Sequence, residues 1–242
     1  MKKELKIPKR ITPDPILESV VELRFNTTLP SEAIFGLLYN KLKTDFPKYE
    51  KLPILQLPEA VRTQDKALEF TPHYKFLNGN FQINVGAKVI SIVHPKPYKG
   101  WEVYFQVIVK IIEDLEDLNF IENITRIGVR YVDFFDKTNI FKHLQFKIED
   151  FPFTIDQSSF STTFEFDKFR TNLQVSNASQ IAINGIQYNG SIFDSDTYDE
   201  IDVIFSKDDV LARISEAHEV EKKVFFNLVT DSFIESLNPE YD

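Results

Sequence analysis

The chain has 242 residues and a formal net charge of −9, and it contains no cysteine. Disulfide scaffolds, thiolate zinc sites, iron–sulfur clusters and cysteine nucleophiles are therefore excluded. Apolar residues make up 43% and charged residues 27%, which is the balance of an ordinary globular chain. Phe is abundant at 23 residues, whereas Gly is scarce at 7, which disfavours the glycine-rich loops that hold nucleotide phosphates.

No run of apolar residues approaches the roughly 18 that a membrane-spanning helix needs. The basic start at residues 1–6 is not followed by an apolar segment of the kind found in secretory signals. We therefore expect no membrane contact and a cytoplasmic location.

Charge is unevenly distributed along the chain. Residues 1–100 carry a net charge of +6, residues 101–137 carry −4 and residues 138–242 carry −11. The acidic C-terminal part should repel nucleic acid, and we do not expect a nucleic-acid partner. Two solvated surfaces of opposite sign, in contact within the fold or between subunits, are the simpler interpretation.

The first 137 residues alternate between strand and helix patterns. Three prolines within residues 1–15 predict an extended N-terminal arm. Asn78-Gly79 predicts a hairpin turn, because both central residues of a type I′ turn need positive φ. The expected strands are 16–25, a short edge strand near Tyr49, 68–71, 74–77, 81–85, 89–93 and 124–134, and the expected helices run from 30 to 47 and from 101 to 118. Residues 16–137 therefore read as an α+β sub-domain.

The remaining residues, 138–242, are rich in strand patterns and end in a helix pattern. The expected strands are 144–148, 160–166, 170–175, 181–188 and 200–205, with turns at 167–168, 176–177 and 189–190. A single long amphipathic helix is expected from 208 to 237. The predicted fold is thus α+β, with two antiparallel sheets, helices packed on one face, and two sub-domains (16–137 and 138–242) that follow the arm.

Three stretches resemble a known protein family. They are Pro15 to Phe25 (PILESVVELRF), Arg126 to Asp133 (RIGVRYVD), and Ala217-His218-Glu219 with the later Phe225 and Thr230-Asp231. They resemble a sporadically distributed, uncharacterised bacterial family of about 250 residues, in which Asn is more usual at the position of Asp133. The resemblance implies no catalytic residue. The family's patchy occurrence is similar to that of genes linked to mobile elements or phage defence.

Known catalytic and metal-binding patterns are incomplete. His218-Glu219 begins like H-E-x-x-H, but Lys222 stands where the second histidine is required, so His218 is interpreted as structural or surface-exposed. The acidic residues between Asp194 and Asp202 lack the glycine of a calcium loop, and they are interpreted as a solvated loop entering a strand. We expect no metal and no cofactor, and we assign no catalytic residue.

The strongest candidate site is a charged strand face. Arg126 and Arg130 share one face of a predicted strand, and Glu22 and Arg24 share a face of another. With Asp133 they form the candidate binding set. If the strands pair, these charges form either a structural cross-strand ladder or a concave surface that holds a partner or an anionic group.

The predicted function follows from the absence of known catalytic and cofactor-binding patterns in the sequence. With no catalytic signature and no cofactor loop, the chain is predicted to be a non-enzymatic binding or assembly subunit. It would act through a protein partner or through self-association. The alternative is an enzyme or a small-ligand sensor with a charged pocket around Arg24 and Arg130.

Overall fold

The strands of the protein form one nine-stranded sheet in the order β2-β3-β4-β5-β1-β6-β9-β8-β7. The computed structural model describes residues 6–146 and 157–241. The predicted α+β class, with antiparallel strands and a long C-terminal helix, is confirmed. The strands form one sheet rather than two, because β6 lies beside β9 and joins the two predicted groups. The elements in chain order are β1 (Ile16–Asn26), α1 (Ser31–Leu42), β2 (Lys48–Lys51), η1 (Pro53–Gln56), α2 (Glu59–Gln64), η2 (Lys66–Leu68), β3 (Tyr74–Leu77), β4 (Gln82–Val85), β5 (Val89–Pro95), α3 (Trp101–Leu118), β6 (Asn123–Asp136), η3 (Ile140–His143), β7 (Ser159–Phe166), β8 (Phe169–Ile183), β9 (Ile186–Ile204), α4 (Lys207–Leu228) and α5 (Asp231–Ser236).

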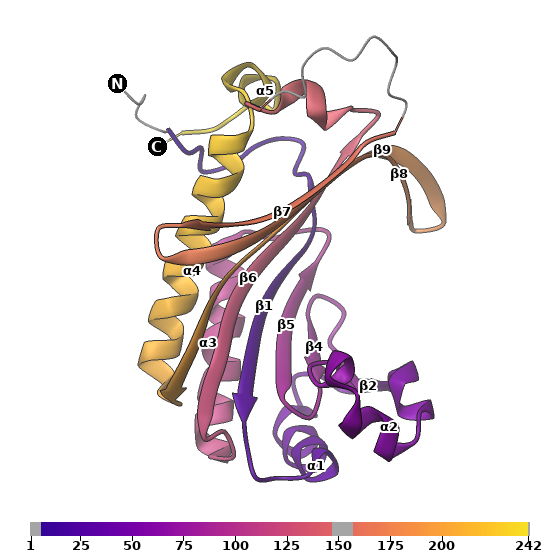
Figure 1. Cartoon of the computed structure of the whole chain (residues 1–242), viewed down its shortest axis with the longest axis vertical. Helices are drawn as coiled ribbons and strands as arrows, with labels where there is room; N and C mark the ends of the chain where they lie inside the picture. The colour runs from indigo at the N-terminus through magenta and orange to yellow at the C-terminus, as the bar shows by residue number, and fades with distance from the viewer. Residues whose placement is uncertain (1–5, 147–156, 242) are drawn as a thin grey trace. The chain divides into compact units, whose positions relative to one another are not determined.

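Packing divides the chain into two compact units, which are described separately. The central unit holds Ser19–Val129 and Tyr198–Glu216, and the terminal unit holds Met1–Glu18, Arg130–Thr197 and Ala217–Asp242. β1, β6, β9 and α4 pass from one unit into the other (Figure 1). The sequence-based boundary between residues 137 and 138 remains a prediction about which segments fold on their own.

Helix α3 supports the sheet of the central unit. It runs from Trp101 to Leu118 as predicted, because apolar residues recur at helical spacing along it. The buried hydroxyl of Tyr104 donates to the carbonyl oxygen of Ile92 at 2.5 Å and accepts from the N–H of Val21 at 2.9 Å. One phenol therefore fixes the helix to β5 and β1.

Helix α1 packs near the β2 edge of the same unit. The ring of Phe35 stacks on that of Tyr74, with centroids 4.0 Å apart. The edge strand β2, predicted near Tyr49, has the sequence KYEK, and all four residues are exposed. A short, charged edge of this kind is protected from pairing with another chain.

Two local predictions in the central unit need correction. Residues 68–71 do not form a strand, because the Asp65 carboxylate accepts from the N–H of Ala67 at 2.9 Å and starts the helical turn η2. The Asn78-Gly79 hairpin is confirmed between β3 and β4, but its turn is not type I′. Only Gly79 has positive φ, at 87°, and the Asn78 side chain closes the turn by accepting from the N–H of Phe81 at 2.8 Å.

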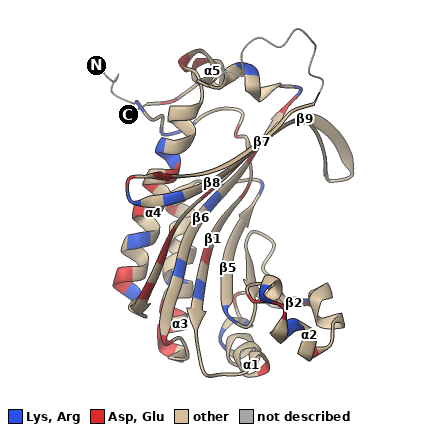
Figure 2. Cartoon of the chain, viewed as in Figure 1, with Lys and Arg blue, Asp and Glu red and all other residues tan. Residues whose placement is uncertain are grey.

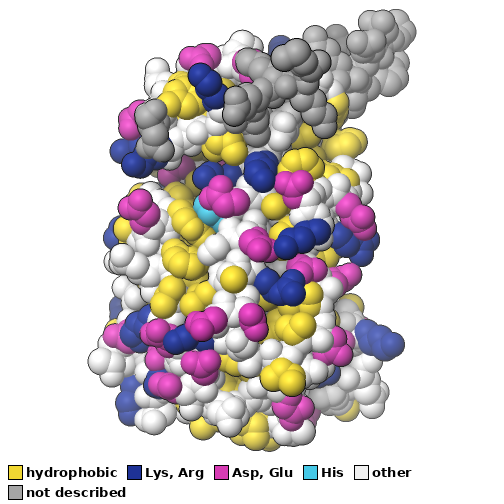
Figure 3. All heavy atoms as spheres, turned by 90° about the vertical axis from the view of Figure 1, so that its left-hand side faces the viewer, with side chains coloured by type: hydrophobic (Ala, Val, Ile, Leu, Met, Phe, Trp, Pro, Cys, Tyr) yellow, Lys and Arg dark blue, Asp and Glu magenta, His cyan; other side chains and the backbone are white. Residues whose placement is uncertain are grey.

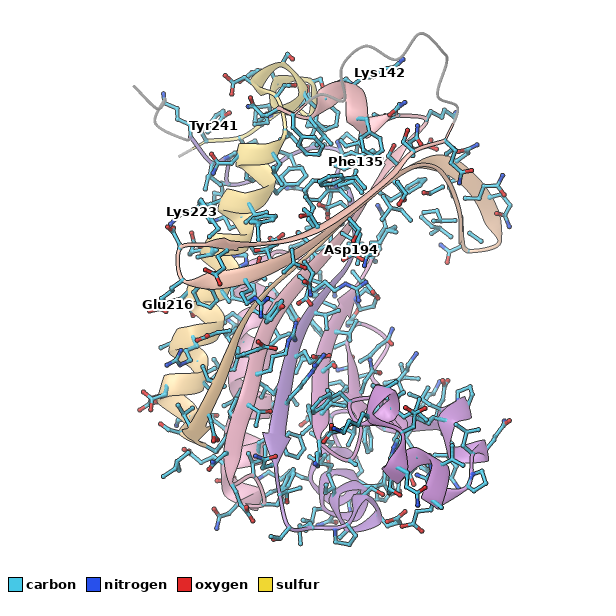
Figure 4. All side chains as sticks on the ribbon, in the orientation of Figure 1. Phe135, Lys142, Asp194, Glu216, Lys223 and Tyr241 are labelled. Carbon is cyan, nitrogen blue, oxygen red and sulfur yellow. The ribbon has the colours of Figure 1, made fainter. Side chains whose placement is uncertain are left out.

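Aromatic side chains fill the core of the terminal unit. Phe193 of β9 meets Phe225 of α4 edge-to-face, with centroids 5.2 Å apart, and Phe135 of β6 meets Phe233 at 5.3 Å. Figure 4 shows Phe135 among these rings. Edge-to-face rings bury large apolar areas without the repulsion of a face-to-face sandwich.

The described part of the N-terminal arm lies along the C-terminal segment. Ile7 and Ile11 pack against the aromatic core, and the N–H of Thr12 donates to the carbonyl oxygen of Leu237 at 2.7 Å. The two ends of the chain therefore belong to the same unit.

The predicted single helix from 208 to 237 is broken. α4 ends at Leu228, and α5 begins at Asp231. Val229 forms an isolated β-bridge with Leu144, which pulls the backbone out of the helix, and the Thr230 hydroxyl caps α5 by accepting from the N–H of Phe233 at 3.3 Å. Leu144 is thus a bridge residue and not the start of a strand. The end of the predicted strand 144–148, residues 147–148, lies outside the described residues.

The turn between β8 and β9 was also predicted at the wrong place. The strands turn at Asn184-Gly185, where φ is 51° and 80°, and they run uninterrupted through the expected turns at 176–177 and 189–190. Gly190 serves another purpose: a Cβ there would lie 2.1 Å from the carbonyl oxygen of Phe135. That glycine allows two backbones to approach closely.

Candidate functional site

Three of the predicted site residues form one ion-pair network in the central unit. Glu22 Oε1 accepts from Arg24 Nε and from Arg126 Nη1, both at 2.8 Å. One carboxylate thus serves two guanidinium groups. The Arg24 guanidinium also lies 4.4 Å from the centre of the Phe70 ring, a cation–π contact.

Arg126 is the buried member of this network. Its side chain is 6% exposed, and its guanidinium lies 4.3 Å from the centre of the Tyr198 ring. It also folds back over Gly128, where an added Cβ would lie 2.6 Å from Nη1. The glycine in R-x-G therefore makes room for the arginine, which gives this motif a structural explanation.

Arg130 has its own partner in the terminal unit. Its Nε and Nη2 donate to Asp194 Oδ1 and Oδ2 at 2.7 and 2.6 Å, a bidentate pair. These hydrogen bonds raise the pKa of Arg130, so it stays cationic. Asp194 lies in β9 (Figure 4), within the acidic stretch that was interpreted as a loop.

Two later residues of that acidic stretch also lie in β9 and find partners in the central unit. Asp199 pairs with Arg213, and Asp202 accepts from the side-chain amide of Asn123 at 2.8 Å. Within residues 6–146 and 157–241, no three His, Asp or Glu side chains are grouped as metal ligands would be. The acidic residues therefore hold strands and helices together.

Asp133 does not lie on the strand face that carries Arg126 and Arg130, which together with Glu22 and Arg24 of β1 is named here the arginine face. It stands three residues after Arg130, and an odd spacing in a strand places two side chains on opposite faces. Asp133 shares its face with Tyr131 and Phe135, and it is buried. The predicted set of five thus separates into the Glu22 network, the Arg130–Asp194 pair and an interior aspartate.

The interior face of the terminal unit carries two further polar pairs. Tyr131 Oη lies 3.1 Å from His218 Nδ1, and the Ser195 hydroxyl donates to the Glu221 carboxyl group. Burial lowers the pKa of His218 to about 3 and raises the pKa of Glu221 to about 8. At neutral pH both side chains are therefore uncharged, and His218 has a structural place in the core.

Sequence reasoning missed a feature of a different kind. Residues 171–193 contain no Asp, Glu, Lys or Arg, although such residues make up 27% of the chain. Their outer part, residues 177–189, is named here the neutral hairpin. It begins where the pairing of β7 with β8 ends, at Ser159 and Ser176, and it turns at Asn184-Gly185.

The neutral hairpin is visible as the loop of β8 and β9 that extends beyond β7 (Figure 1), and it is free of blue and red in Figure 2. By contrast, side chains of both charges are interspersed over the surface shown in Figure 3. At its base lies an open hollow whose lining is rich in amide side chains. The lining residues are Lys137, Thr138, Asn139, Asn177, Ala178, Asn189 and Gly190.

The hairpin has one apolar face. A two-residue turn at 184–185 places Ile183 opposite Ile186 and Ile181 opposite Tyr188, so that all four side chains share a face. Ile186 is 58% exposed, and the other three are half-buried. The absence of charge over 23 residues is the sequence signal that could have drawn attention to this segment.

In the described part of the chain, no helix combines the length and the hydrophobicity needed to cross a bilayer. No family model and no curated protein matches the sequence. The resemblance to the sporadic bacterial family therefore stays a prediction.

Proposed function

We propose that the chain is a binding or assembly subunit that works through protein–protein contacts, with the neutral hairpin as its contact surface. The observation that carries this proposal is the 23-residue stretch without charge, part of which extends past its neighbouring strand. Apolar side chains exposed together on a rim of polar groups are typical of protein interaction sites.

A comparison with the edge strand β2 supports this choice of surface. The edge strand β2 is four residues long and carries three charges, a pattern that prevents pairing with other chains. The neutral hairpin has neither charge nor proline, the residues that usually protect exposed strands. A segment without such protection is suited to being covered by a partner.

The enzyme or ligand-sensor alternative receives less support. The fork of Arg130 is engaged by both oxygens of Asp194, and Arg126 is buried against Glu22 and Tyr198. Arginines that bind an anionic ligand need donors directed at the ligand. These contacts favour the structural interpretation of the arginine face. A setting in a mobile-element or phage-defence system stays an expectation from the resemblance alone.

The test compares two charge insertions at exposed isoleucines of β9. Ile186→Glu lies in the neutral hairpin, whereas Ile204→Glu lies outside it at an 80% exposed position. Each tagged variant is expressed in the native host at the native level, cross-linked and separated by mass. We expect complexes larger than one chain with the wild type and with Ile204→Glu, but not with Ile186→Glu. Identical complexes for all three chains would contradict the proposal.

A further inference from the structure

The chemistry of the neutral hairpin restricts the kind of partner that it fits. The polar side chains of the neutral hairpin are amides and hydroxyls. Ser179 lies on the strand face of Ile181 and Ile183, whereas Gln180 and Gln187 alternate with the apolar residues and lie on the opposite face. A hydroxyl both donates and accepts hydrogen bonds, so that of Ser179 can pair with the same group of a second copy. A patch of charged residues of one sign cannot do this.

The net charge of the whole chain limits the surfaces at which two copies can meet. Two copies that each carry −9 repel one another wherever their acidic surfaces meet. The neutral hairpin, residues 177–189, offers a surface on which two copies approach without placing like charges together. A two-fold interface needs a surface that is complementary to itself, and this segment satisfies that condition.

We propose that the neutral hairpin packs against the neutral hairpin of a second copy of this chain. The four apolar side chains of one copy, Ile181, Ile183, Ile186 and Tyr188, would cover the same four of the other. This inference rests on the proposed function and adds the identity of the partner. Because each copy contributes one hairpin, the interface is small, and we expect dissociation in the micromolar range, at roughly 1–100 µM.

The test uses charge variants at Ile186, singly and mixed. A patch of four side chains across a two-fold axis brings the two copies of residue 186 within about one Debye length, roughly 8 Å at physiological salt. Ile186→Glu and Ile186→Lys should each weaken the dimer by about a hundredfold or more, since like charges then face each other. Mixing the two variants places opposite charges together and should restore a dimer.

The measurement is the mass of the purified chain by sedimentation equilibrium between 1 and 200 µM. The control is the same pair of substitutions at Ile204, which should leave the wild-type dimer unchanged. A wild-type mass of one chain at every concentration would overturn the inference, and so would a mixture of the Ile186 variants that stays monomeric. If the purified chain is monomeric but the host complex is still lost with Ile186→Glu, the second copy is the wrong partner, while the proposed function stands.

Discussion

The arginine face of β1 and β6 and the neutral hairpin of β8 and β9 use opposite chemistries. On the arginine face, Glu22 serves two guanidinium groups and Asp194 serves a third. The neutral hairpin has no charged side chain, yet it exposes Ile186 by more than half. The charged groups of the first region contact each other within the chain, whereas the second region presents apolar groups that a partner can cover.

The difference shows that a side chain can contact a partner only if its own chain leaves that side chain accessible. A charged side chain whose partners lie in its own chain contributes to stability, and an exposed apolar side chain without charged neighbours contributes to association. Variants in the two regions should therefore affect different measurements, and the following predictions separate them.

The largest effect on stability is expected from Glu22→Gln. Arg126 is 6% exposed, and loss of the carboxylate removes the negative charge of a hydrogen-bonded partner of this buried cation. We expect the free energy of unfolding in urea to fall by about 3 kcal/mol. Glu69→Gln is the matched control, since it breaks an exposed pair with Lys88 and should change stability by about 0.5 kcal/mol or less. Equal effects of the two variants would show that the arginine face is not a structural ladder.

The buried pairs of the terminal unit should make stability depend on pH in two directions. Glu221 has an ordinary pKa of 4.5 and a folded pKa of about 8, so stability falls as pH rises between these values. His218 has an ordinary pKa of 6.5 and a folded pKa of about 3, so stability falls as pH drops through that range. The two effects offset each other between about pH 4.5 and 6.5.

Above pH 6.5 only the Glu221 effect remains, with a slope of up to about 1.4 kcal/mol per pH unit until pH 8. Glu221→Gln should remove this alkaline decline, whereas the exposed neighbour variant Glu219→Gln should keep it. Urea unfolding at pH 6.5 and 8 measures the difference. Parallel pH profiles for wild type and Glu221→Gln would rule out a buried, protonated carboxyl group.

A smaller effect is expected from Gly128→Ala, and it should depend on Arg126. The added methyl group would collide with the guanidinium that folds over Gly128. We expect a loss of about 1–2 kcal/mol in the wild type, and little loss in an Arg126→Ala background, where the guanidinium is absent. A double-mutant cycle by urea unfolding gives the coupling. Equal losses in both backgrounds would mean that the glycine does not serve the arginine.

The smallest effect on stability is expected from Ile186→Glu, the variant with the largest expected effect on assembly. The side chain is mostly exposed, so the free energy of unfolding of the isolated chain should change by about 0.5 kcal/mol or less. Thermal and urea unfolding at a protein concentration below 1 µM measure it. A loss above about 1 kcal/mol would show that the neutral hairpin stabilises its own chain.

Regular periodicity explains which elements could be predicted from the sequence. β1 and α3 were predicted within one residue of their ends, because alternation and helical spacing are local patterns. The turn between β8 and β9 was not predicted correctly, because the segment holds two Asn-Gly pairs, at 184–185 and 189–190, with the same local preference for a turn. Only the contact of Gly190 with the Phe135 backbone, which is distant in sequence, shows that the second pair must stay in a strand.

The candidate site was predictable in part for a similar reason. That Glu22 and Arg126 could meet follows from strand faces, on the condition, stated from the sequence, that their two strands pair. Asp133 was grouped with Arg130, although a spacing of three residues separates their faces in a strand. The break of the C-terminal helix at Thr230 depends on the bridge from Val229 to Leu144, and such long-range contacts leave no local pattern.

Amide hydrogen exchange at two protein concentrations tests most directly whether the neutral hairpin, and not the arginine face, is the contact surface. Peptides that cover residues 177–189 should exchange more slowly at 200 µM than at 1 µM, since association covers them. Peptides that cover residues 20–26 and 124–132 should exchange at the same rate at both concentrations. Slower exchange at 200 µM in the arginine-face peptides, with none in residues 177–189, would contradict our assignment of the contact surface.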